Sequence, residues 1–424
     1  MKVYIALIIF CFCSALKAQI SFDEYFTNKT LRFDYMLAGD KEKTIVYPIG
    51  LKEEPTWGGS VTNLNDMFNY GNLRYELYDS LSNTLIYSRG YCTLYQEWQT
   101  TAEAKIIDRS FYEVATLPFP KNTVRFVLKQ RDHNGLFTSL YETFINPSDY
   151  FIRKEKPINA GVTKIIDSGD PHICVDVAFI AEGYTIEEMD KFRTDVKKMA
   201  KVLIETEPFK KFKNNINIWA VEAVSMESGT DVPGKGIYLN TAINSSFYTF
   251  NVDRYLTTLD IKTVNDYAAT VPHDNIVVLI NSSRYGGGGV FNYYTGATSD
   301  NVLSSKVFIH EFGHAFAGLG DEYYTSEVSY EDFYPLNVEP WEPNLTTLVN
   351  FDSKWKNLVD KDTPIPTPLE KKYLNKIGVF EGGGYTGRGV YRPEIDCRMK
   401  SNGEAGFCAI CSNAIEEMIG FYIK

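Results

Sequence analysis

The sequence lacks two features that would place it among nucleic-acid-binding or membrane proteins. It carries 43 Lys and Arg against 54 Asp and Glu, for a formal net charge of −11, and it contains no long basic run. Because no Lys/Arg run is long enough to follow a phosphate backbone, the sequence argues against nucleic-acid binding, and we expect no nucleic-acid partner. Beyond the N-terminus, no segment reaches the roughly 18 consecutive apolar residues of a membrane helix, so we expect no membrane span.

The N-terminus has the pattern of a signal peptide over residues 1–18. Lys2 supplies a positive charge, residues 4–12 form a short apolar run, and Ala18 is a small residue at the end of the segment. The apolar run is too short to cross a bilayer, which argues against a membrane anchor. We therefore expect the mature chain to be exported, to the periplasm, the cell surface or the extracellular medium.

Cysteine and histidine are also scarce, with seven and five residues respectively. Five cysteines follow residue 18, and three of these, Cys397, Cys408 and Cys411, lie close together near the C-terminus. A local disulfide is the default for such a cluster in an exported protein, so we expect Cys397 to bond to Cys408 or Cys411. A Cys-x-x-Cys zinc site at Cys408 and Cys411 is the weaker alternative, because the sequence has no second pair of this kind.

Residues 19–150 have the pattern of an all-β domain. Apolar residues alternate with polar ones, as at Leu31, Phe33 and Tyr35, and this period of two is typical of half-buried strands. Turn-forming residues separate the apolar stretches. We therefore predict a β-sandwich domain over residues 19–150, followed by a linker over residues 151–164.

Residues 165–424 show a different pattern, in which apolar strands alternate with helices. Thr185 can cap a helix that continues through apolar residues at helical spacing. Short continuous apolar runs are typical of strands that are buried on both faces of a sheet. This alternation predicts an α/β domain with a covered sheet. The expected strands are residues 175–180, 216–224 and 276–280.

The residues that point to chemistry lie in one predicted helix that ends near Leu319. His310 and His314 are four residues apart, so one turn of helix places both imidazoles on the same face, where they can bind one ion. Glu311 lies beside the first histidine and can reach a water molecule on the metal. Zinc would lower the pKa of that water, Glu311 would accept its proton, and hydroxide would attack a peptide carbonyl. The alternative is a pair of surface histidines beside a solvated Glu, but two of only five histidines in one such pattern argue against chance.

A catalytic zinc normally has three protein ligands and one open position. The third ligand must come from outside the helix, and Gly318 and Gly320 allow the chain to reverse sharply towards the histidines. Asp321 follows at once, which makes it the expected third ligand. Glu322 should then point to the opposite side of an extended segment. The alternative third ligand is Glu331 on a following helix, which would place the chain in the other large class of zinc peptidases.

The segment from His310 to Tyr323, His-Glu-Phe-Gly-His-Ala-Phe-Ala-Gly-Leu-Gly-Asp-Glu-Tyr, resembles the M64 peptidases, a family named for bacterial immunoglobulin A peptidases. The resemblance covers nearly the whole mature chain and implies a metzincin-like peptidase domain behind an N-terminal β-sandwich. It also implies a Met turn beneath the metal, for which residues 396–401 with Met399 are the candidate. The resemblance also suggests an edge strand above the cleft at residues 290–294, for which a flexible connecting loop is the alternative. Immunoglobulin cleavage belongs to few members of the family, so we do not transfer that substrate.

These observations predict a secreted zinc-dependent endopeptidase that holds one catalytic Zn²⁺ through His310, His314 and Asp321. Glu311 is the expected general base, and no other cofactor is expected. The expected partner is a protein or peptide substrate, with host glycoproteins among the candidates. Two alternatives remain. One is a gluzincin-type peptidase with Glu331 as third ligand, and the other is a secreted surface- or glycan-binding protein whose zinc site is vestigial.

Overall fold

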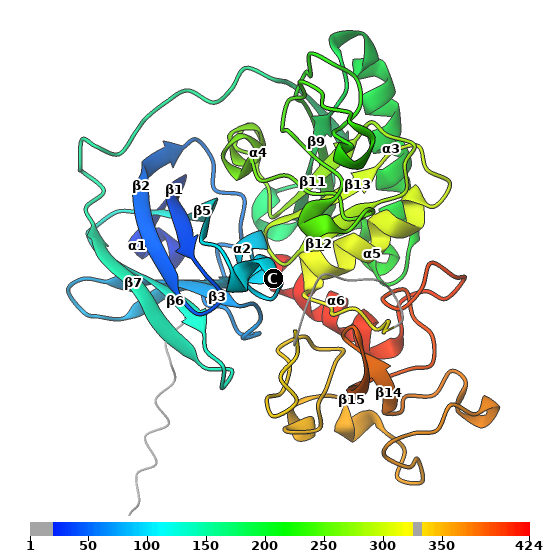
Figure 1. Cartoon of the computed structure of the whole chain (residues 1–424). Helices are drawn as coiled ribbons and strands as arrows, with labels where there is room; N and C mark the ends of the chain where they lie inside the picture. The colour runs from blue at the N-terminus through cyan, green and yellow to red at the C-terminus, as the bar shows by residue number, and fades with distance from the viewer. Residues whose placement is uncertain (1–19, 325–332) are drawn as a thin grey trace, which may run out of the picture.

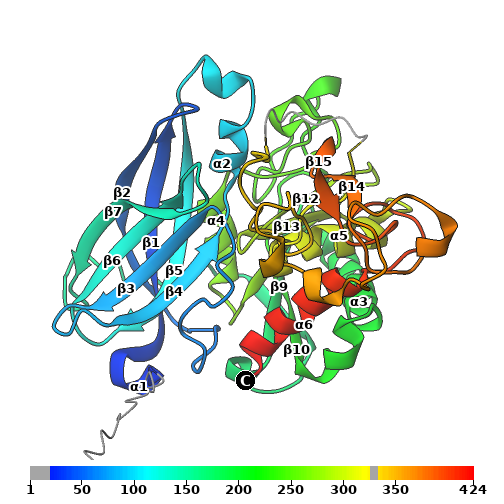
Figure 2. The same cartoon turned by 90° about the horizontal axis from the view of Figure 1, so that it is seen from below.

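The computed structural model describes residues 20–324 and 333–424. A β-rich N-terminal region and a mixed α/β region lie side by side (Figures 1 and 2). The predicted signal peptide and the alternative ligand Glu331 lie outside the described residues. Among the described helices, none is both long enough and apolar enough to cross a membrane.

Two antiparallel sheets make up the N-terminal region. One has the strand order β2-β1-β5, and the other has the order β4-β3-β6-β7. Two short helices, α1 and α2, accompany them. The elements are α1 (Phe22–Tyr25), β1 (Phe26–Gly39), β2 (Thr44–Glu54), β3 (Leu73–Asp79), β4 (Leu85–Tyr91), α2 (Leu94–Gln99), β5 (Arg109–Pro120), β6 (Val124–Arg131) and β7 (Phe137–Ile145).

The apolar face of β1 lies in the core of this region, as its alternation predicts. Leu31, Phe33 and Tyr35 are almost fully buried. The ring of Phe33 contacts the ring of Phe126 on β6 at a centroid distance of 4.9 Å, so residues of both sheets share this core. Ring contacts of this kind add to the burial of apolar area, which accounts for the abundance of Phe and Tyr here.

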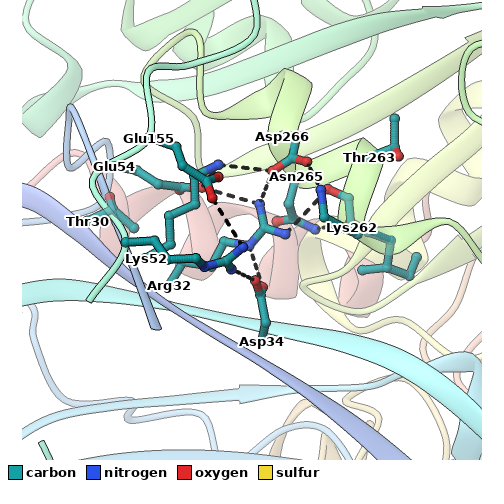
Figure 3. Close-up of polar contacts among 12 residues, drawn as sticks. Thr30, Arg32, Asp34, Lys52, Glu54, Glu155, Lys262, Thr263, Asn265 and Asp266 are labelled. Carbon is teal, nitrogen blue, oxygen red and sulfur yellow. Dashed lines mark hydrogen bonds and ion pairs between the residues drawn. The ribbon is translucent and has the colours of Figure 1, made fainter. Parts of the chain in front are cut away.

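The polar face of β1 is also covered, although the period of two predicts half-buried strands. Arg32 and Asp34 are both 0% exposed. Arg32 Nε lies 2.6 Å from Asp34 Oδ1, and its Nη1 lies 2.7 Å from Asp266 Oδ1 of helix α4 (Ile261–Ala268). Lys52 Nζ on β2 lies 3.0 Å from the same oxygen of Asp266 (Figure 3). Because buried charges are stable only when paired, this network holds the N-terminal region against α4.

The mixed region is built on a six-stranded sheet with the order β12-β13-β11-β9-β10-β8. The four inner strands are parallel, and the outer strands β12 and β8 run antiparallel to their neighbours. Helices α3 (Met189–Glu205) and α5 (Ser304–Ala317) lie on one side of the sheet, and α4 lies on the side of the N-terminal region (Figure 1). The strands are β8 (Gly161–Ile166), β9 (Val175–Glu182), β10 (Ile216–Glu222), β11 (Asn275–Ile280), β12 (Gly287–Val290) and β13 (Tyr294–Thr298).

Two strands differ from their predicted places. Strand β8 occupies residues 161–164, which we expected to be linker, because its backbone pairs with β10 at the edge of the sheet. The edge strand predicted at residues 290–294 lies earlier, on the glycine run of β12, and Tyr294 already belongs to β13. The glycines are needed because β12 lies directly against helix α5: a Cβ on Gly289 would come within 2.1 Å of the carbonyl oxygen of Glu311.

The last part of the chain connects both regions. It contains the hairpin β14 (Phe380–Gly383) and β15 (Thr386–Arg392), and it ends in helix α6 (Ala409–Tyr422). The ring of Tyr422 stacks on Phe316 of α5, and Arg89 of β4 donates a hydrogen bond to the Tyr422 hydroxyl at 3.0 Å. Short 3-10 helices lie at Glu103–Lys105, Pro171–Ile173, Ile186–Glu188, Phe209–Asn215, Pro233–Lys235, Thr249–Asn251, Phe351–Ser353, Lys356–Leu358 and Lys371–Tyr373.

Candidate active site

Helix α5 carries the His-Glu-x-x-His residues and ends close to its predicted end. Phe308, Phe312 and Phe316 are spaced by four residues and are buried, so they anchor one face of the helix in the core. The other face presents the two histidines. Gly318 ends the helix with a left-handed backbone (φ 63°), which a residue without a Cβ adopts at no steric cost.

The structure brings His310, His314 and Asp321 together at one point. The two histidine Nε2 atoms lie 3.1 Å apart. Asp321 Oδ1 lies 3.0 Å from Nε2 of His310 and 3.2 Å from Nε2 of His314. A tetrahedral zinc ion with bonds of about 2.0 Å separates its ligand atoms by roughly 3.3 Å. These three residues, the His-Asp group, therefore have the spacing of three ligands to one ion.

Backbone carbonyl groups set the orientation of both imidazoles. His310 Nδ1 lies 2.9 Å from the carbonyl oxygen of Arg398, and His314 Nδ1 contacts the carbonyl oxygen of Leu319. Because a carbonyl oxygen can only accept, each Nδ1 must carry a hydrogen, and each neutral ring then offers its lone pair at Nε2. Metal-binding histidines are held by hydrogen bonds of this kind.

The turn after helix α5 holds Asp321 against the histidines. The buried side chain of Asn344 accepts a hydrogen bond from the Gly320 amide (2.7 Å) and donates one to the Gly320 carbonyl oxygen (2.8 Å). Asp321 Oδ2 accepts a hydrogen bond from the Tyr385 hydroxyl at 2.6 Å, whereas the buried Oδ1 faces the Nε2 atoms of both histidines. A buried carboxylate oxygen in this state fits a position that binds a cation.

Burial and mutual charge shift the pKa values of these groups. Burial lowers the pKa of His314, but the Asp321 carboxylate more than offsets this effect and raises the pKa to about 9. Burial raises the pKa of Asp321, but the two histidines hold it below its ordinary value. Burial also raises the pKa of Glu311, and the histidines oppose this only in part. A carboxyl group with a raised pKa is suited to exchanging protons near neutral pH.

A cleft over these residues is lined by several parts of the chain. The N-terminal region contributes Thr93 and Glu97, which lie at the start of α2 and within it. Arg254 and Tyr323 line the same cleft beside Glu311. The N-terminal region therefore forms part of the wall of the candidate active site. The other lining residues include Gly287, Gly289, Val290 and Phe291 near the sheet edge, and Tyr334, Trp341, Glu342 and Tyr385 from the C-terminal part.

Met399 lies beneath helix α5, where the candidate Met turn was expected. It is fully buried, and a Cβ on Gly313 would come within 3.0 Å of its Sδ atom. Gly313 therefore allows the methionine to pack directly under the turn of helix between the two histidines.

The predicted disulfide beside Met399 is wrong. All five cysteines of the described residues are free. Cys397 Sγ and Cys411 Sγ are 3.7 Å apart, well beyond the length of a covalent bond between sulfur atoms. A fourth side chain lies beside these sulfur atoms: Glu322 points away from the His-Asp group, as expected, and its Oε1 lies 3.3 Å from Cys411 Sγ.

Reasoning from the sequence missed three residues of this site. Tyr385 reaches Asp321 from a hairpin loop 64 positions later in the chain. Asn344 clamps the glycine turn, and Arg254 lines the cleft from the segment before helix α4. None of them belongs to a local motif, so only the fold brings them to the site.

Comparison with known families gives these residues their context. A family model described as IgA peptidase M64 matches residues 163–377 and 370–419, and a model of the peptidase M64 N-terminus matches residues 21–142. A search of curated proteins finds no match. The two family models cover both regions of the fold and confirm the resemblance inferred from the residues around the two histidines. The chain therefore belongs to the M64 family and is a peptidase.

Proposed function

We propose that this peptidase is a zinc-dependent endopeptidase, with His310, His314 and Asp321 as metal ligands and Glu311 as general base. The observation that carries the proposal is the close spacing of the two Nε2 atoms and Asp321 Oδ1, all within 3.2 Å of one another. Two imidazoles and a carboxylate suit zinc, and three protein ligands leave a position open, as catalytic sites require.

The residues around the ligands support hydrolysis. A zinc ion held there supplies Lewis-acid chemistry, because it acidifies water and polarises a peptide carbonyl. Glu311 lines the cleft beside the ligands and carries a raised pKa, so it can accept a proton from the attacking water and return it to the leaving amine. Arg254 adds a positive charge on the same side of the cleft, where it can stabilise negative charge on the substrate.

The cleft also supports action within a peptide chain. Strand β12 is the edge of its sheet among the described residues, and Gly287, Gly289 and Val290 line the cleft next to Glu311. We propose that the substrate lies extended along this edge, as peptides do when they add to a sheet. The substrate class is therefore proteins or peptides, with host glycoproteins among the candidates.

The proposal also includes the fold of both regions and the export of the chain. The glycine turn that precedes Asp321, together with Met399 beneath helix α5, supports a metzincin-like peptidase domain. The two sheets that share a core support a β-sandwich for the N-terminal region. The signal-peptide pattern of residues 1–18 supports export.

Two variants test this function. Glu311→Gln should keep zinc and lose hydrolysis of casein by about 10²–10⁴-fold, because the amide cannot accept the proton. Asp321→Ala should lose both zinc and activity, because one of three ligands is gone. Glu187→Gln, at an exposed position, serves as the matched control and should match the wild type. Full activity in Glu311→Gln, or full zinc content in Asp321→Ala, would overturn the proposal.

A non-catalytic binding protein and a gluzincin-type peptidase predict other results. A vestigial site predicts no hydrolysis by the wild type under any condition. A gluzincin-type site predicts that Glu331→Ala loses zinc while Asp321→Ala retains it. Metal analysis of the two variants side by side separates these classes.

A further inference from the structure

A second group of potential metal ligands lies behind the candidate active site. It consists of Glu322, Cys397, Cys408 and Cys411, here called the Cys-Glu group. Each of the four residues is at most 5% exposed, and one ligand atom from each lies within 4.8 Å of all the others. Nothing in the proposed hydrolysis uses these residues, so their convergence needs a separate explanation.

The distances within the Cys-Glu group match ligands around one ion. Cys397 Sγ lies 3.7 Å from Cys411 Sγ, and Glu322 Oε1 lies 3.3 Å from Cys411 Sγ and 4.0 Å from Cys408 Sγ. A tetrahedral zinc ion with Zn–S bonds of about 2.3 Å separates two sulfur ligands by roughly 3.8 Å. A disulfide would require about 2.05 Å between its two sulfur atoms.

The carboxylate of Glu322 also indicates a cation. Its Oε1 accepts a hydrogen bond from Asn344 at 3.0 Å, but Oε2 is buried without a hydrogen-bond partner. A buried carboxylate is costly unless a positive charge or hydrogen bonds compensate it. Arg392 and Lys400 are close enough to interact electrostatically with Glu322, and they would balance the excess negative charge of a site with three thiolates.

We propose that Glu322, Cys397, Cys408 and Cys411 bind a second zinc ion, which has a structural role. Three sulfur donors exclude calcium and magnesium, which bind oxygen, and they favour zinc in tetrahedral geometry. Four protein ligands in a closed and buried position are typical of structural zinc sites, which leave no position for a substrate.

The proposed ion would fix the two chain segments that position the ligands of the candidate active site. Glu322 follows Asp321 directly, and its backbone amide donates a hydrogen bond to the carbonyl oxygen of Met399 at 2.8 Å. Cys397 precedes Arg398, whose carbonyl oxygen orients His310. The second site therefore ties together the segments that carry the third ligand of the His-Asp group, the hydrogen-bond acceptor of His310 and the methionine beneath helix α5.

Metal analysis of the mature chain, purified without added metal, tests the proposal. The wild type should contain about two zinc ions per chain, one in each kind of site. The double variant H310A/H314A should keep about one zinc ion, the one in the Cys-Glu group. The double variant C408S/C411S should lose that ion and keep the one in the His-Asp group. Cys174→Ser, at a buried cysteine that is remote from the group, is the matched control and should retain the wild-type content.

Spectroscopy of H310A/H314A identifies the ligands even if the cysteine variants do not fold. X-ray absorption should show a zinc ion with about three sulfur neighbours at about 2.3 Å. If H310A/H314A contains no zinc, or contains zinc without sulfur neighbours, the proposal of a second site is overturned. So would a disulfide among Cys397, Cys408 and Cys411 in peptide maps of the unreduced wild type. These outcomes do not depend on peptidase activity, so the proposed function stands or falls separately.

Discussion

The two groups of ligands differ in exposure and in donor atoms, although they share neighbouring residues of the chain. Asp321 belongs to the His-Asp group and Glu322 to the Cys-Glu group, because an extended segment sends successive side chains to opposite sides. The two histidine side chains are each 13% exposed and line the cleft, whereas Cys397 and Cys411 are 0% exposed. An open group of nitrogen and oxygen donors suits chemistry on a substrate, and a closed, sulfur-rich group suits a structural role.

The difference between the open and the closed group indicates how a buried group can fix the residues of an active site. Residues around a metal ligand must themselves be fixed, because small displacements of a reacting group reduce the rate strongly. Here the segment from Cys397 to Met399 contacts both groups. The sulfur atom of Cys397 belongs to the Cys-Glu group, and the carbonyl oxygen of Arg398 contacts His310 of the His-Asp group. Changes to the open group should therefore alter chemistry, and changes to the closed group should alter stability.

The largest contrast is expected between isosteric changes at the two neighbouring acids. Asp321→Asn should reduce casein hydrolysis by about 10³-fold, because a neutral amide replaces one of three zinc ligands. Glu322→Gln should reduce the free energy of unfolding by about 4 kcal/mol, because loss of a bound metal is among the most destabilising changes. Activity assays and chemical denaturation of both variants give the comparison. Equal stability loss in the two variants would contradict the division of roles.

Chelators should separate the two groups by rate. The His-Asp group lines the cleft, so 1,10-phenanthroline should remove its zinc and abolish activity while the chain stays folded. The Cys-Glu group is buried and should release zinc at least about 10-fold more slowly, because release requires local opening. Zinc released over time, followed alongside activity and circular dichroism, measures both rates. Release of all zinc in one fast phase would show that the second ion is not enclosed.

Glu113 shows what a buried carboxyl group does without a cation. It is 0% exposed, and burial raises its pKa to about 8, an effect that the nearby Tyr293 and Thr93 side chains oppose only in part. Its contribution to stability is therefore fully present below the ordinary pKa of 4.5 and is lost as the pH rises towards about 8.

Glu113→Gln should remove the loss of stability that the wild type shows as the pH rises, because glutamine does not titrate. The stability of the wild type should fall relative to that of the variant by up to about 1.4 kcal/mol per pH unit between the two pKa values, and the difference should level off above them. Denaturation at pH 5, 7 and 9 measures the effect. A variant that is less stable than the wild type at pH 9 would show that Glu113 is ionised and paired, as proposed for Glu322.

Local patterns predicted a good part of the fold. The alternation in β1 and the helical spacing in α3 were sufficient, because each is set by burial of one face. The pattern could not show that Arg32 and Asp34 are buried, because their partner Asp266 lies more than 200 residues away in the sequence. The glycine run was not predicted as a strand, since its need for glycine arises only from contact with helix α5.

The candidate site also has one part that the sequence predicts and another that only the fold brings together. His310, Glu311 and His314 form a local motif, and the structure brings both histidines to Asp321 as expected, although their roles as ligands stay a prediction. The complete Cys-Glu group could not be recognised, because Glu322 lies 75 or more positions before the cysteines that it joins. A cluster of cysteines in an exported chain favours a disulfide unless a fourth ligand is known. The local signals were the Cys-x-x-Cys spacing of Cys408 and Cys411, which gave a zinc site only as the weaker alternative, and the acid next to the third ligand.

The smallest effect is expected for Met399→Leu, a change at the residue that lies between the two groups. Met399 packs under Gly313 of helix α5 together with Phe407 and Leu319, so its role is to fill space beneath the two histidines. Met399→Leu conserves volume and should cost less than about 1.5 kcal/mol of stability, with zinc content unchanged. Met399→Ala leaves a cavity and should cost about 2–5 kcal/mol. Packing alone predicts that kcat/KM follows stability in this series. A different outcome is possible, in which Met399→Leu is as stable as the wild type but loses most of its activity. In that case the sulfur atom of Met399 itself acts on the histidines, and Met399 belongs with neither the open group nor the closed one.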